Sequence, residues 1–331
     1  MNEIENTSPA FENPELVTIG HILLDIRGYV DEFPKPDSSV KIKGDIHYSP
    51  GGSATNVAVG AGRLGIQSTI CSIIGFDDYG LQIIQHLMKE HIDISNIKIN
   101  YHKPSGISML VINKEGSPII IQSLGANEPF PIAQLDRNQI IQAKHLHMTG
   151  TDPLILKEAA HVAKHNAKGN VRVSFDPGRS ISHMGYEKLM DILENIDYLI
   201  INRKEAAHLR GISEDTATLE VIKELRAVLP ETITLIIKGG SKETIVKSTT
   251  EFFAVPPYNV TVFDTIGAGD AFAAGFISGL LRNASLKRAI ILAHATAGYK
   301  VQFGGAQSSP TSAQLEEFLQ EHKDEVAARD L

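Results

Sequence analysis

The sequence predicts an α/β fold: a doubly wound, mostly parallel sheet with helices on both faces, plus a small β-sheet lid. From about residue 135 onward, short apolar segments alternate with segments of helical character. These segments are short and mostly apolar and lack the alternation of a half-exposed strand, which is typical of parallel strands that are buried on both faces. Two other regions, near 16–48 and 98–123, contain alternating strands that do not follow this rhythm. We expect them to form a small sheet over the crevice at the strand ends.

The elements of the first half follow from local periodicity. LVTIG at 16–20 is a short apolar strand, and VKIKGDIHY at 40–48 alternates as a half-exposed strand does. The other predicted elements are a helix with small residues on one side at 54–64, a buried strand at 68–75, a helix at 81–91, and a hairpin at 106–125 that turns at Lys114-Glu115-Gly116.

The second half predicts the main sheet and its covering helices. Buried strands are expected at 145–150, 171–178, 197–202 and 234–240, with helices at 154–167, 185–195, 204–211 and 218–228, and then near 268–282, 285–300 and 312–326. We therefore expect a flexible tail at 1–13 and a single domain at 14–326. Its lid would be discontinuous, from about 20–50 and 98–123.

Composition excludes several classes of protein. The 331 residues are 42% hydrophobic and 21% charged, which is ordinary for a soluble globular chain. A net charge of -8 argues against a nucleic-acid or membrane-surface binder, because such proteins need a basic surface. The single cysteine, Cys71, lies in an apolar run and predicts a buried thiol in a reducing, cytoplasmic setting. No stretch approaches the ~18 uninterrupted apolar residues of a membrane span.

The segment DTIGAGDAFAAGFI at 264–277 places a carboxylate where backbone N–H groups gather. A helix that begins near Ala268 offers free N–H groups and a positive dipole end, and Gly267 and Gly269 leave them accessible to an anion such as phosphate. Asp270 can then accept the proton of a hydroxyl that attacks phosphorus. The alternative is a glycine turn with a helix cap, in which Asp270 only favours the dipole.

A second glycine cluster, Pro50-Gly51-Gly52-Ser53-Ala54-Thr55-Asn56, precedes the helix predicted at 54–64. Paired glycines permit close approach of a small ligand, and Asn56 can hydrogen-bond sugar hydroxyls; the alternative is a capped turn. The chain lacks the P-loop motif and the third glycine of a dinucleotide fingerprint, so a P-loop NTPase and a Rossmann dehydrogenase are both poor readings.

These two segments carry a resemblance to a known family. GGSATNVAVGAGRLG with GFDDYG, followed about two hundred residues later by DTIGAGDAFAAGF, resembles the two signatures of the ribokinase-like (phosphofructokinase-B) carbohydrate kinases. The match is colinear over roughly residues 16 to 320, and GHILLD, GAN, NRKE and AHATAGYKVQFGGAQ resemble further family segments. The ribokinase-like fold, a doubly wound sheet with a small β lid, agrees with the pattern described above.

The resemblance implies a role for each matching residue. The catalytic set is the base Asp270 with the anion hole Gly267, Ala268 and Gly269. The substrate pocket is Asp25, Gly51, Gly52 and Asn56. The nucleotide site is Asn202, Lys238, Gly240, His294 and Gly305. Glu205 would bind Mg²⁺ through water, and Asp264 and Ser309 match a monovalent-cation site that several members fill with K⁺.

One departure from the family pattern follows Lys238. The family loop is commonly G-x-x-G, whereas here Gly240 is followed three residues later by Glu243. This carboxylate either alters the preference for the phosphate donor or points to solvent.

Two local features indicate the substrate class. VDEFPKPDSSVKI and HMTGTDP…VSFDPGR resemble the archaeal-type nucleoside kinase and ribose-1-phosphate kinase branch. Arg179, on the loop after a sheet strand, would hold a carboxylate or phosphate on the substrate, or would be a surface arginine.

The sequence thus predicts an ATP-dependent, Mg²⁺-requiring kinase that phosphorylates a primary hydroxyl of a small sugar-type substrate, a nucleoside or another ribose compound. A ketohexose or 2-keto-3-deoxy sugar acid kinase is the alternative among enzymes. A non-catalytic sugar or nucleotide sensor on the same fold is the alternative outside them. An exposed apolar face on the lid would favour a homodimer.

Overall fold

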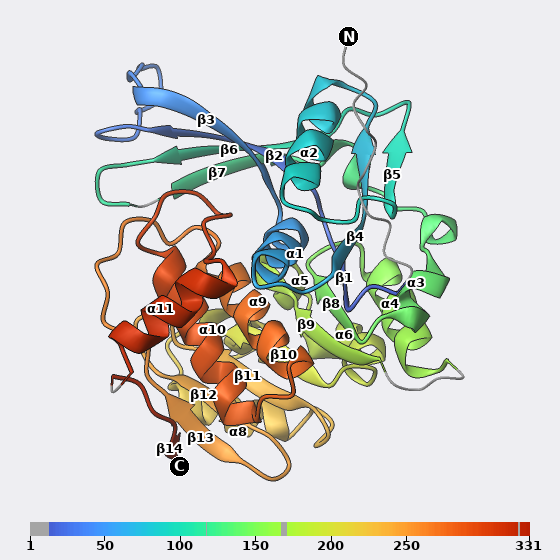
Figure 1. Cartoon of the computed structure of the whole chain (residues 1–331), viewed down its shortest axis with the longest axis vertical. Coiled ribbons are helices and arrows are strands. Elements are labelled where there is room, and N and C mark those ends of the chain that lie inside the picture. The colour runs from blue at the N-terminus through green and yellow to red at the C-terminus, as the bar shows by residue number, and fades with distance from the viewer. Residues whose placement is uncertain (1–12, 117, 167–170, 324) are drawn as a thin grey trace.

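The computed structural model describes residues 13–116, 118–166, 171–323 and 325–331. Within these ranges the chain forms two sheets, and helices cover both faces of the larger one (Figure 1). The predicted tail at 1–13 lies outside the described residues except for its last position.

The main sheet has ten strands in the described part of the chain. Their spatial order is β14 (Arg329–Asp330), β13 (Phe252–Val255), β12 (Thr244–Lys247), β11 (Thr234–Lys238), β10 (Tyr198–Asn202), β9 (Arg172–Asp176), β8 (His145–Thr149), β1 (Leu16–Ile19), β4 (Ser68–Gly75) and β5 (Ile97–Asn100). The strands from β11 to β5 are parallel, and the β12–β14 end is antiparallel. The strand order reverses between β1 and β8, so the carboxyl ends of these two strands mark the expected ligand crevice.

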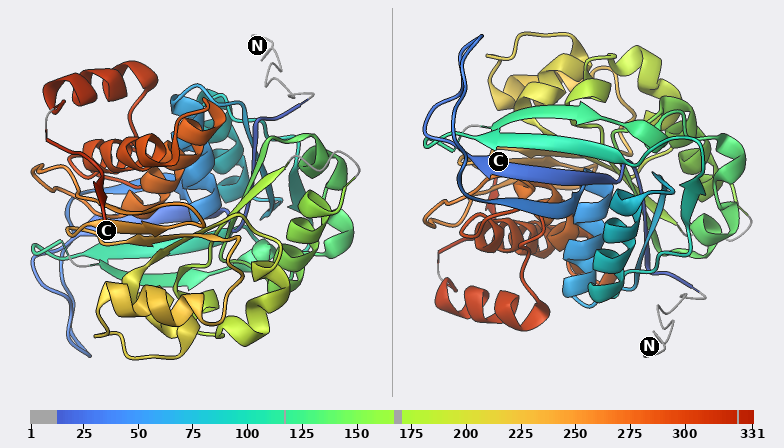
Figure 2. Two further views of the ribbon diagram at one scale, coloured as in Figure 1. Left: turned by 90° about the horizontal axis from the view of Figure 1, so that it is seen from below. Right: turned by 90° about the horizontal axis from the view of Figure 1, so that it is seen from above.

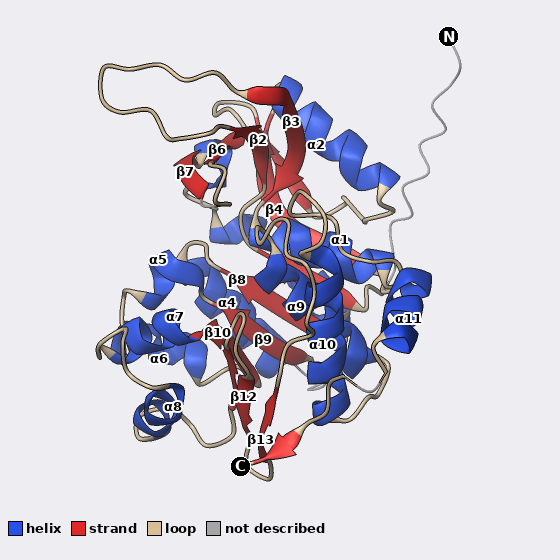
Figure 3. Cartoon of the chain, turned by 90° about the vertical axis from the view of Figure 1, so that its left-hand side faces the viewer, coloured by secondary structure: helices blue, strands red, loops and turns tan. Residues whose placement is uncertain are grey.

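Helices cover this sheet in two layers, which lie on opposite sides of it in Figures 2 and 3. One layer is α3 (Arg137–Gln142), α4 (Pro153–Lys164), α5 (Gly178–Ser182), α6 (Tyr186–Leu193), α7 (Arg203–Arg210) and α8 (Thr218–Arg226). The other is α1 (Ser53–Arg63), α2 (Asp78–Lys89), α9 (Ala268–Leu281), α10 (Leu286–Lys300) and α11 (Ser312–Glu321). Two single-turn 3₁₀ helices, η1 (Gly125–Asn127) and η2 (Ile132–Gln134), follow the lid strands.

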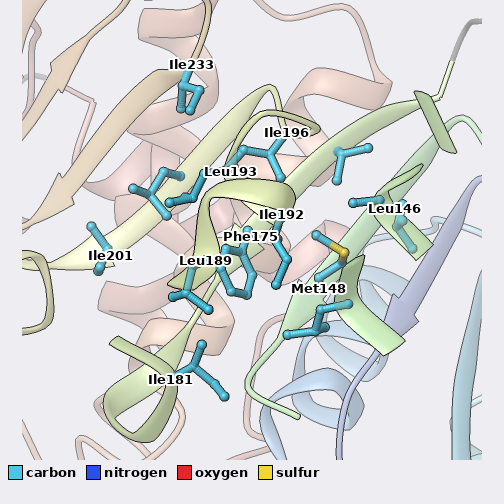
Figure 4. Packing of buried hydrophobic residues seen from close by; sticks show 14 of the residues in the cluster. Leu146, Met148, Phe175, Ile181, Leu189, Ile192, Leu193, Ile196, Ile201 and Ile233 are labelled. Carbon is cyan, nitrogen blue, oxygen red and sulfur yellow. The ribbon is translucent and has the colours of Figure 1, made fainter. Parts of the chain in front are cut away.

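Both faces of the central strands are covered, so even their polar residues are buried. All eight residues of β4 are buried, as are all five of β8. On one face, Phe175 of β9 packs among Leu189 and Ile192 of α6 and Met148 of β8 (Figure 4). The parallel pattern read from the sequence is therefore a consequence of this double cover.

The second sheet is the lid. Its order is β3 (Lys43–Gly51), β2 (Leu23–Tyr29), β6 (Gly106–Ile112) and β7 (Pro118–Ser123), and it projects from one end of the main sheet (Figures 1 and 3). The central pair β2 and β6 is parallel, and the outer pairs are antiparallel. Asn127 anchors the start of the lid: its side chain accepts from the Ile22 N–H at 2.9 Å and donates to the Ile22 carbonyl at 2.8 Å.

The predicted fold class is confirmed, but some predicted elements lie elsewhere and some observed elements were not predicted. The strands near 16–48 and 98–123 were expected in the lid, yet β1 pairs with β8 and β4 inside the main sheet, because it is buried on both faces. β5 pairs with β4 at the edge of the main sheet, where half-exposure gives it an alternating pattern. The short helix α5 and the antiparallel strands β12–β14 were not predicted, since each is five residues or fewer. The last helix was expected to reach residue 326, but it ends at Glu321, and the chain then returns to pair β14 with β13.

Candidate active site

The two glycine clusters, more than two hundred residues apart, meet at the crevice. Asp270 lies in the first turn of α9, and its Oδ2 accepts a hydrogen bond from Asn56 Nδ2 of α1 at 2.7 Å. Gln307 donates to the Oδ1 of the same Asn56 at 3.3 Å, which fixes the orientation of the amide. Burial is the main reason that the pKa of Asp270 is raised, and the nearby Asp176 charge adds to it.

The turn before Asp270 has the geometry of an open helix N-terminus. Gly267 is the N-cap residue of α9 with φ of 77°, and a Cβ there would lie 2.6 Å from the Ala306 carbonyl oxygen. Only glycine fits this position without strain. The Ala268 N–H, one of the expected anion-hole donors, already donates to the Thr265 carbonyl at 3.1 Å.

The lid contributes Asp25, which lies on β2 and is 8% exposed. A Cβ on Gly51 of the neighbouring strand β3 would lie 2.2 Å from the carboxyl carbon of Asp25, so the glycine leaves room for the carboxylate. Burial raises the pKa of Asp25 to about 7, and the Asp270 charge contributes to the rise. Gly52, the N-cap residue of α1 with φ of 93°, packs against the His21 carbonyl oxygen. Asp25, Asn56 and Asp270 therefore gather at one place.

A partly buried ion pair, missed by the sequence reasoning, lies beside the anion hole. Lys238, at the end of β11, places its Nζ 2.5 Å from Oδ2 of Asp176, at the end of β9. The same Nζ is 3.3 Å from the position that a Gly269 Cβ would occupy. Asp176 and Lys238 are the last residues of two parallel strands that are separated by β10, and ligands of such sheets bind beyond the carboxyl ends of the strands. The position of Asp176 at the end of a parallel strand was therefore the signal that could have identified it.

Asn202 and Glu205 form a capping box at the start of α7. Asn202 Oδ1 accepts from the Glu205 N–H at 3.0 Å, and Glu205 Oε2 accepts from the Asn202 N–H at 3.2 Å. The pKa of Glu205 is raised, first by burial and then by the Asp176 charge, while Lys238 opposes the rise. The capping box thus holds Glu205 within electrostatic reach of the ion pair.

A cavity of about 530 Å³ opens next to the first turn of α9. Its mostly apolar lining includes Lys238, Gly240, Gly269 and His294, three of which were predicted nucleotide-binding residues. His294 stands edge-on to Phe272 with ring centroids 5.2 Å apart. Burial lowers the pKa of His294 to about 4, so its imidazole is neutral at pH 7.

Two other predicted nucleotide-binding residues lie elsewhere. In the described part of the chain, neither Asn202 nor Gly305 is among the residues that line the cavity. Gly305 instead faces the lid, where a Cβ would lie 2.7 Å from Arg27 Nη1. The Gly305 N–H donates to Asp264 Oδ2 at 2.7 Å.

The predicted cation-site residues Asp264 and Ser309 are both buried. The Asp264 carboxylate also accepts from the Ile266 N–H at 2.9 Å, and its main-chain carbonyl accepts from Lys300 Nζ at 2.8 Å. Burial lowers the pKa of Lys300 to about 8, while the Asp264 charge opposes that fall.

The two remaining sequence candidates lie at the surface. Arg179 is exposed on α5, beyond the carboxyl end of β9. Glu243 pairs with Arg329 of β14 at 3.1 Å, and both side chains are exposed. Of the two alternatives left open for Glu243, the structure supports the surface position.

Metal binding by protein side chains alone is not indicated. The described residues contain no group of three or more His, Cys, Asp or Glu side chains arranged to hold a metal ion. Mg²⁺ commonly keeps several waters and binds through one or two carboxylates plus substrate phosphates, and Glu205 and Asp176 are compatible with that mode. As for membranes, no helix in the described ranges has the length and apolar character to cross one.

Fold and site together define a kinase that acts on a small hydroxylated substrate. Residues 13–313 match the pfkB family carbohydrate kinase, and the chain belongs to that family. It is similar to the ATP-dependent ribose-1-phosphate kinase of Halopiger xanaduensis (30% identity, covering 93% of this chain and 99% of that one). It is also similar to the nucleoside kinase of Methanocaldococcus jannaschii (27% identity, 93% and 98%). The ribokinase structure of Thermotoga maritima superposes with a TM-score of 0.79 (26% identity, 93% and 99%).

Proposed function

We propose that this kinase transfers the γ-phosphoryl group of ATP to a primary hydroxyl of a ribose compound, with Asp270 as the general base. The observation that carries the proposal is the 2.7 Å hydrogen bond from Asn56 to Asp270, because it joins the substrate segment to the anion hole. A carboxylate in that position can receive a proton from an alcohol held by Asn56 and Asp25.

The proposed reaction is an in-line displacement. Asp25 and Asn56 orient the substrate, and Asp270 takes the hydroxyl proton as the new O–P bond forms. The bond between the γ-phosphorus and the β,γ-bridging oxygen breaks, and ADP leaves with that electron pair. Lys238 and the free amides of the α9 first turn neutralise the charge that develops on the transferred group. The raised pKa of Asp270 makes it a stronger base than an ordinary aspartate.

ATP would occupy the 530 Å³ cavity, with its triphosphate toward Lys238 and Gly269. The neutral His294 would lie beside the adenine and offer a ring nitrogen for hydrogen bonding. When bound, Mg²⁺ would be held through water by Glu205 and Asp176 and would offset phosphate charge.

Arg27 favours a substrate that carries an anionic group. It lies two residues after Asp25 on β2, so both side chains point to the same face of the lid. Its guanidinium lies against Gly305 and interacts electrostatically with Asp25. A phosphate on the ribose would pair with Arg27, which makes ribose-1-phosphate our first substrate; the similar kinase of Halopiger xanaduensis bears this name. A nucleoside is the second candidate, as in the similar kinase of Methanocaldococcus jannaschii.

The test is ADP release from ATP and Mg²⁺ over a substrate panel. The panel contains ribose-1-phosphate, ribose, four nucleosides, fructose and 2-keto-3-deoxygluconate, so it also covers the ketohexose and sugar-acid alternatives. Asp270→Asn should lower kcat by about 10²- to 10⁴-fold with little change in substrate affinity. Asp78→Asn, at the exposed first turn of α2, is the matched control and should leave turnover unchanged. Near-normal turnover of Asp270→Asn would refute the base assignment, and binding without turnover in the wild type would favour a sensor.

We also propose that the chain forms a homodimer through the outer face of the lid. Tyr48, Ile26, Met109 and Ile121 are cross-strand neighbours on one face, opposite to Asp25, and Tyr48 and Ile121 are each 57% exposed. A second copy of this face would bury them. Light scattering should show a dimer for the wild type at micromolar concentration and a monomer for Ile121→Lys. A monomeric wild type would contradict the proposal.

A further inference from the structure

Lys300, the last residue of α10, is buried in an unusual way. Its side chain is 0% exposed and is among the largest fully buried side chains of the described chain. Lysine is almost never fully buried unless it is paired, because the ammonium loses its hydration. The partner here is the main-chain carbonyl of Asp264, which accepts from Nζ at 2.8 Å.

The ammonium contacts the first residue of the 264–270 turn, which carries the anion hole. Asp264 begins this turn, and its carboxylate holds the Ile266 N–H at 2.9 Å and the Gly305 N–H at 2.7 Å. The loop after α10 packs against the same turn: Ser308 Oγ donates to the Gly305 carbonyl at 2.9 Å and lies 3.4 Å from the Lys300 carbonyl oxygen. Lys300 therefore joins the end of α10 to the start of the 264–270 turn.

Burial lowers the pKa of Lys300 to about 8, and the two nearby carboxylates oppose that fall, so the side chain is mostly a cation at pH 7. The electrostatic contributions to Lys300 come from Asp264 and Asp270, which attract it, and from Arg27 of the lid, which repels it. A positive charge at this point balances two carboxylates that are otherwise poorly solvated. It also adds to the positive potential of the α9 N-terminus, where phosphate would bind.

A monovalent metal ion does not fit the same place. Such an ion is held by several carbonyl and side-chain oxygens, yet the Asp264 carbonyl is already bonded to Lys300. Ser309, the other expected ligand, packs against α1: its Oγ is 3.1 Å from the position of a Gly60 Cβ, and its carbonyl accepts from Arg63 at 3.1 Å. A second cation beside the ammonium would also be repelled. The expected K⁺ site therefore disagrees with the residues present.

We propose that the Lys300 ammonium is the built-in cation of this site, so that the enzyme needs no potassium. Lys300 is a positioning residue: it stabilises the 264–270 turn and, through that turn, the placement of Asp270. The catalytic part of this inference rests on the proposed function.

The first test compares the wild type in potassium-free buffer with tetramethylammonium and in buffer with KCl at the same ionic strength. Its kcat should be equal in both. Lys300→Ala should lower kcat on the order of 10- to 100-fold, as expected for a displaced reacting group, and K⁺ or NH₄⁺ should restore part of it. Lys300→Met fills the space with an uncharged chain and should not be rescued. Lys89→Ala, which removes an exposed lysine from the last turn of α2, is the matched control and should behave as the wild type.

A second readout does not depend on turnover. In thermal unfolding, K⁺ or NH₄⁺ should raise the Tm of Lys300→Ala and leave that of the wild type and of Lys300→Met unchanged, because only the vacated site binds the ion. Stimulation of the wild type by K⁺, or a Lys300→Ala variant with full activity and no cation effect, would overturn the inference. An inactive wild type with the expected Tm pattern would reject the proposed function and retain the cation assignment. Should Lys300→Ala fail to fold, the wild-type potassium comparison alone still decides, since a K⁺ requirement would refute the built-in cation.

Discussion

Replacement of Asp25 by asparagine should stabilise the empty enzyme at alkaline pH and abolish its substrate binding. The Asp25 carboxyl is 8% exposed, and burial raises its pKa from the ordinary 3.8 to about 7. The folded state then binds this proton more tightly than the unfolded state does. Stability is therefore lost as the pH rises from about 4 to about 7, and the full penalty is present above pH 7.

The size of the effect follows from the pKa rise. A change from 3.8 to about 7 corresponds to about 4 kcal/mol, at about 1.36 kcal/mol per pKa unit. For 331 residues the unfolding entropy is about 0.7 kcal/mol/K, so Asp25→Asn should raise the Tm by about 6 °C at pH 8. Near pH 4 the difference between the two proteins should fall below about 1 kcal/mol, because the carboxyl is then protonated in the folded wild type and only about half ionised in the unfolded chain.

The assay is urea and thermal unfolding of both proteins from pH 4 to pH 9. Asp45→Asn, on the exposed part of the neighbouring strand β3, is the control and should show no such pH-dependent gain. An Asp25→Asn protein that is equally stable or less stable than the wild type at pH 8 would refute the reasoning. The Asp25→Asn protein should also lose turnover of the proposed substrate, because binding-site residues are often kept for function at a cost in stability.

Three further predictions concern a glycine, a surface pair and the core. In steady-state kinetics, Gly51→Ala should raise the KM for the sugar substrate on the order of 100-fold and leave the KM for ATP unchanged, because the new Cβ would displace the Asp25 carboxyl. In an Asp25→Ala background the same substitution should add little. Glu243→Gly should leave the KM for ATP unchanged and alter the unfolding free energy by no more than about 1 kcal/mol, because it breaks only an exposed ion pair with Arg329. A change in the preferred phosphate donor would contradict the surface position of Glu243. Phe175→Ala should lower the unfolding free energy by about 3–5 kcal/mol in urea titrations, and a loss below about 1 kcal/mol would show that this part of the core is loosely packed.

Local pattern was sufficient for most of the fold. The strands β4 and β8 are buried along their whole length because both faces are covered, and each can be recognised from eight or fewer consecutive residues. The edge strand β5 is exposed on one side, so its alternation is the same as that of a lid strand, and sequence alone could not assign it to the main sheet. The strand β14 forms by pairing with residues almost eighty positions earlier, which leaves no local trace.

The site shows the same division between local and long-range information. Asp270 and Gly267 belong to one turn, so their chemistry can be read from consecutive residues. Asp176 and Lys238 lie 62 positions apart, and their pairing depends on the order of the strands. Lys300 has the position of an ordinary lysine in the last turn of a helix, where it would favour the dipole from solvent. Its burial depends on the 264–270 turn folding over it, and no sequence window contains both.

The distribution of charge explains why the site is stable before ATP arrives. Asp176 neutralises Lys238 in the empty enzyme, and the Asp264 carbonyl and carboxylate do the same for Lys300. A triphosphate in the cavity would compete with Asp176 for Lys238, and Asp176 would then be free to take part in binding Mg²⁺ through water. Lys300 is fully buried and does not line the cavity, so a ligand in the cavity would leave its partners unchanged. In our proposals the two lysines therefore differ in kind: Lys238 is a cation that changes partner during the reaction, and Lys300 is a fixed charge that keeps Asp270 in place.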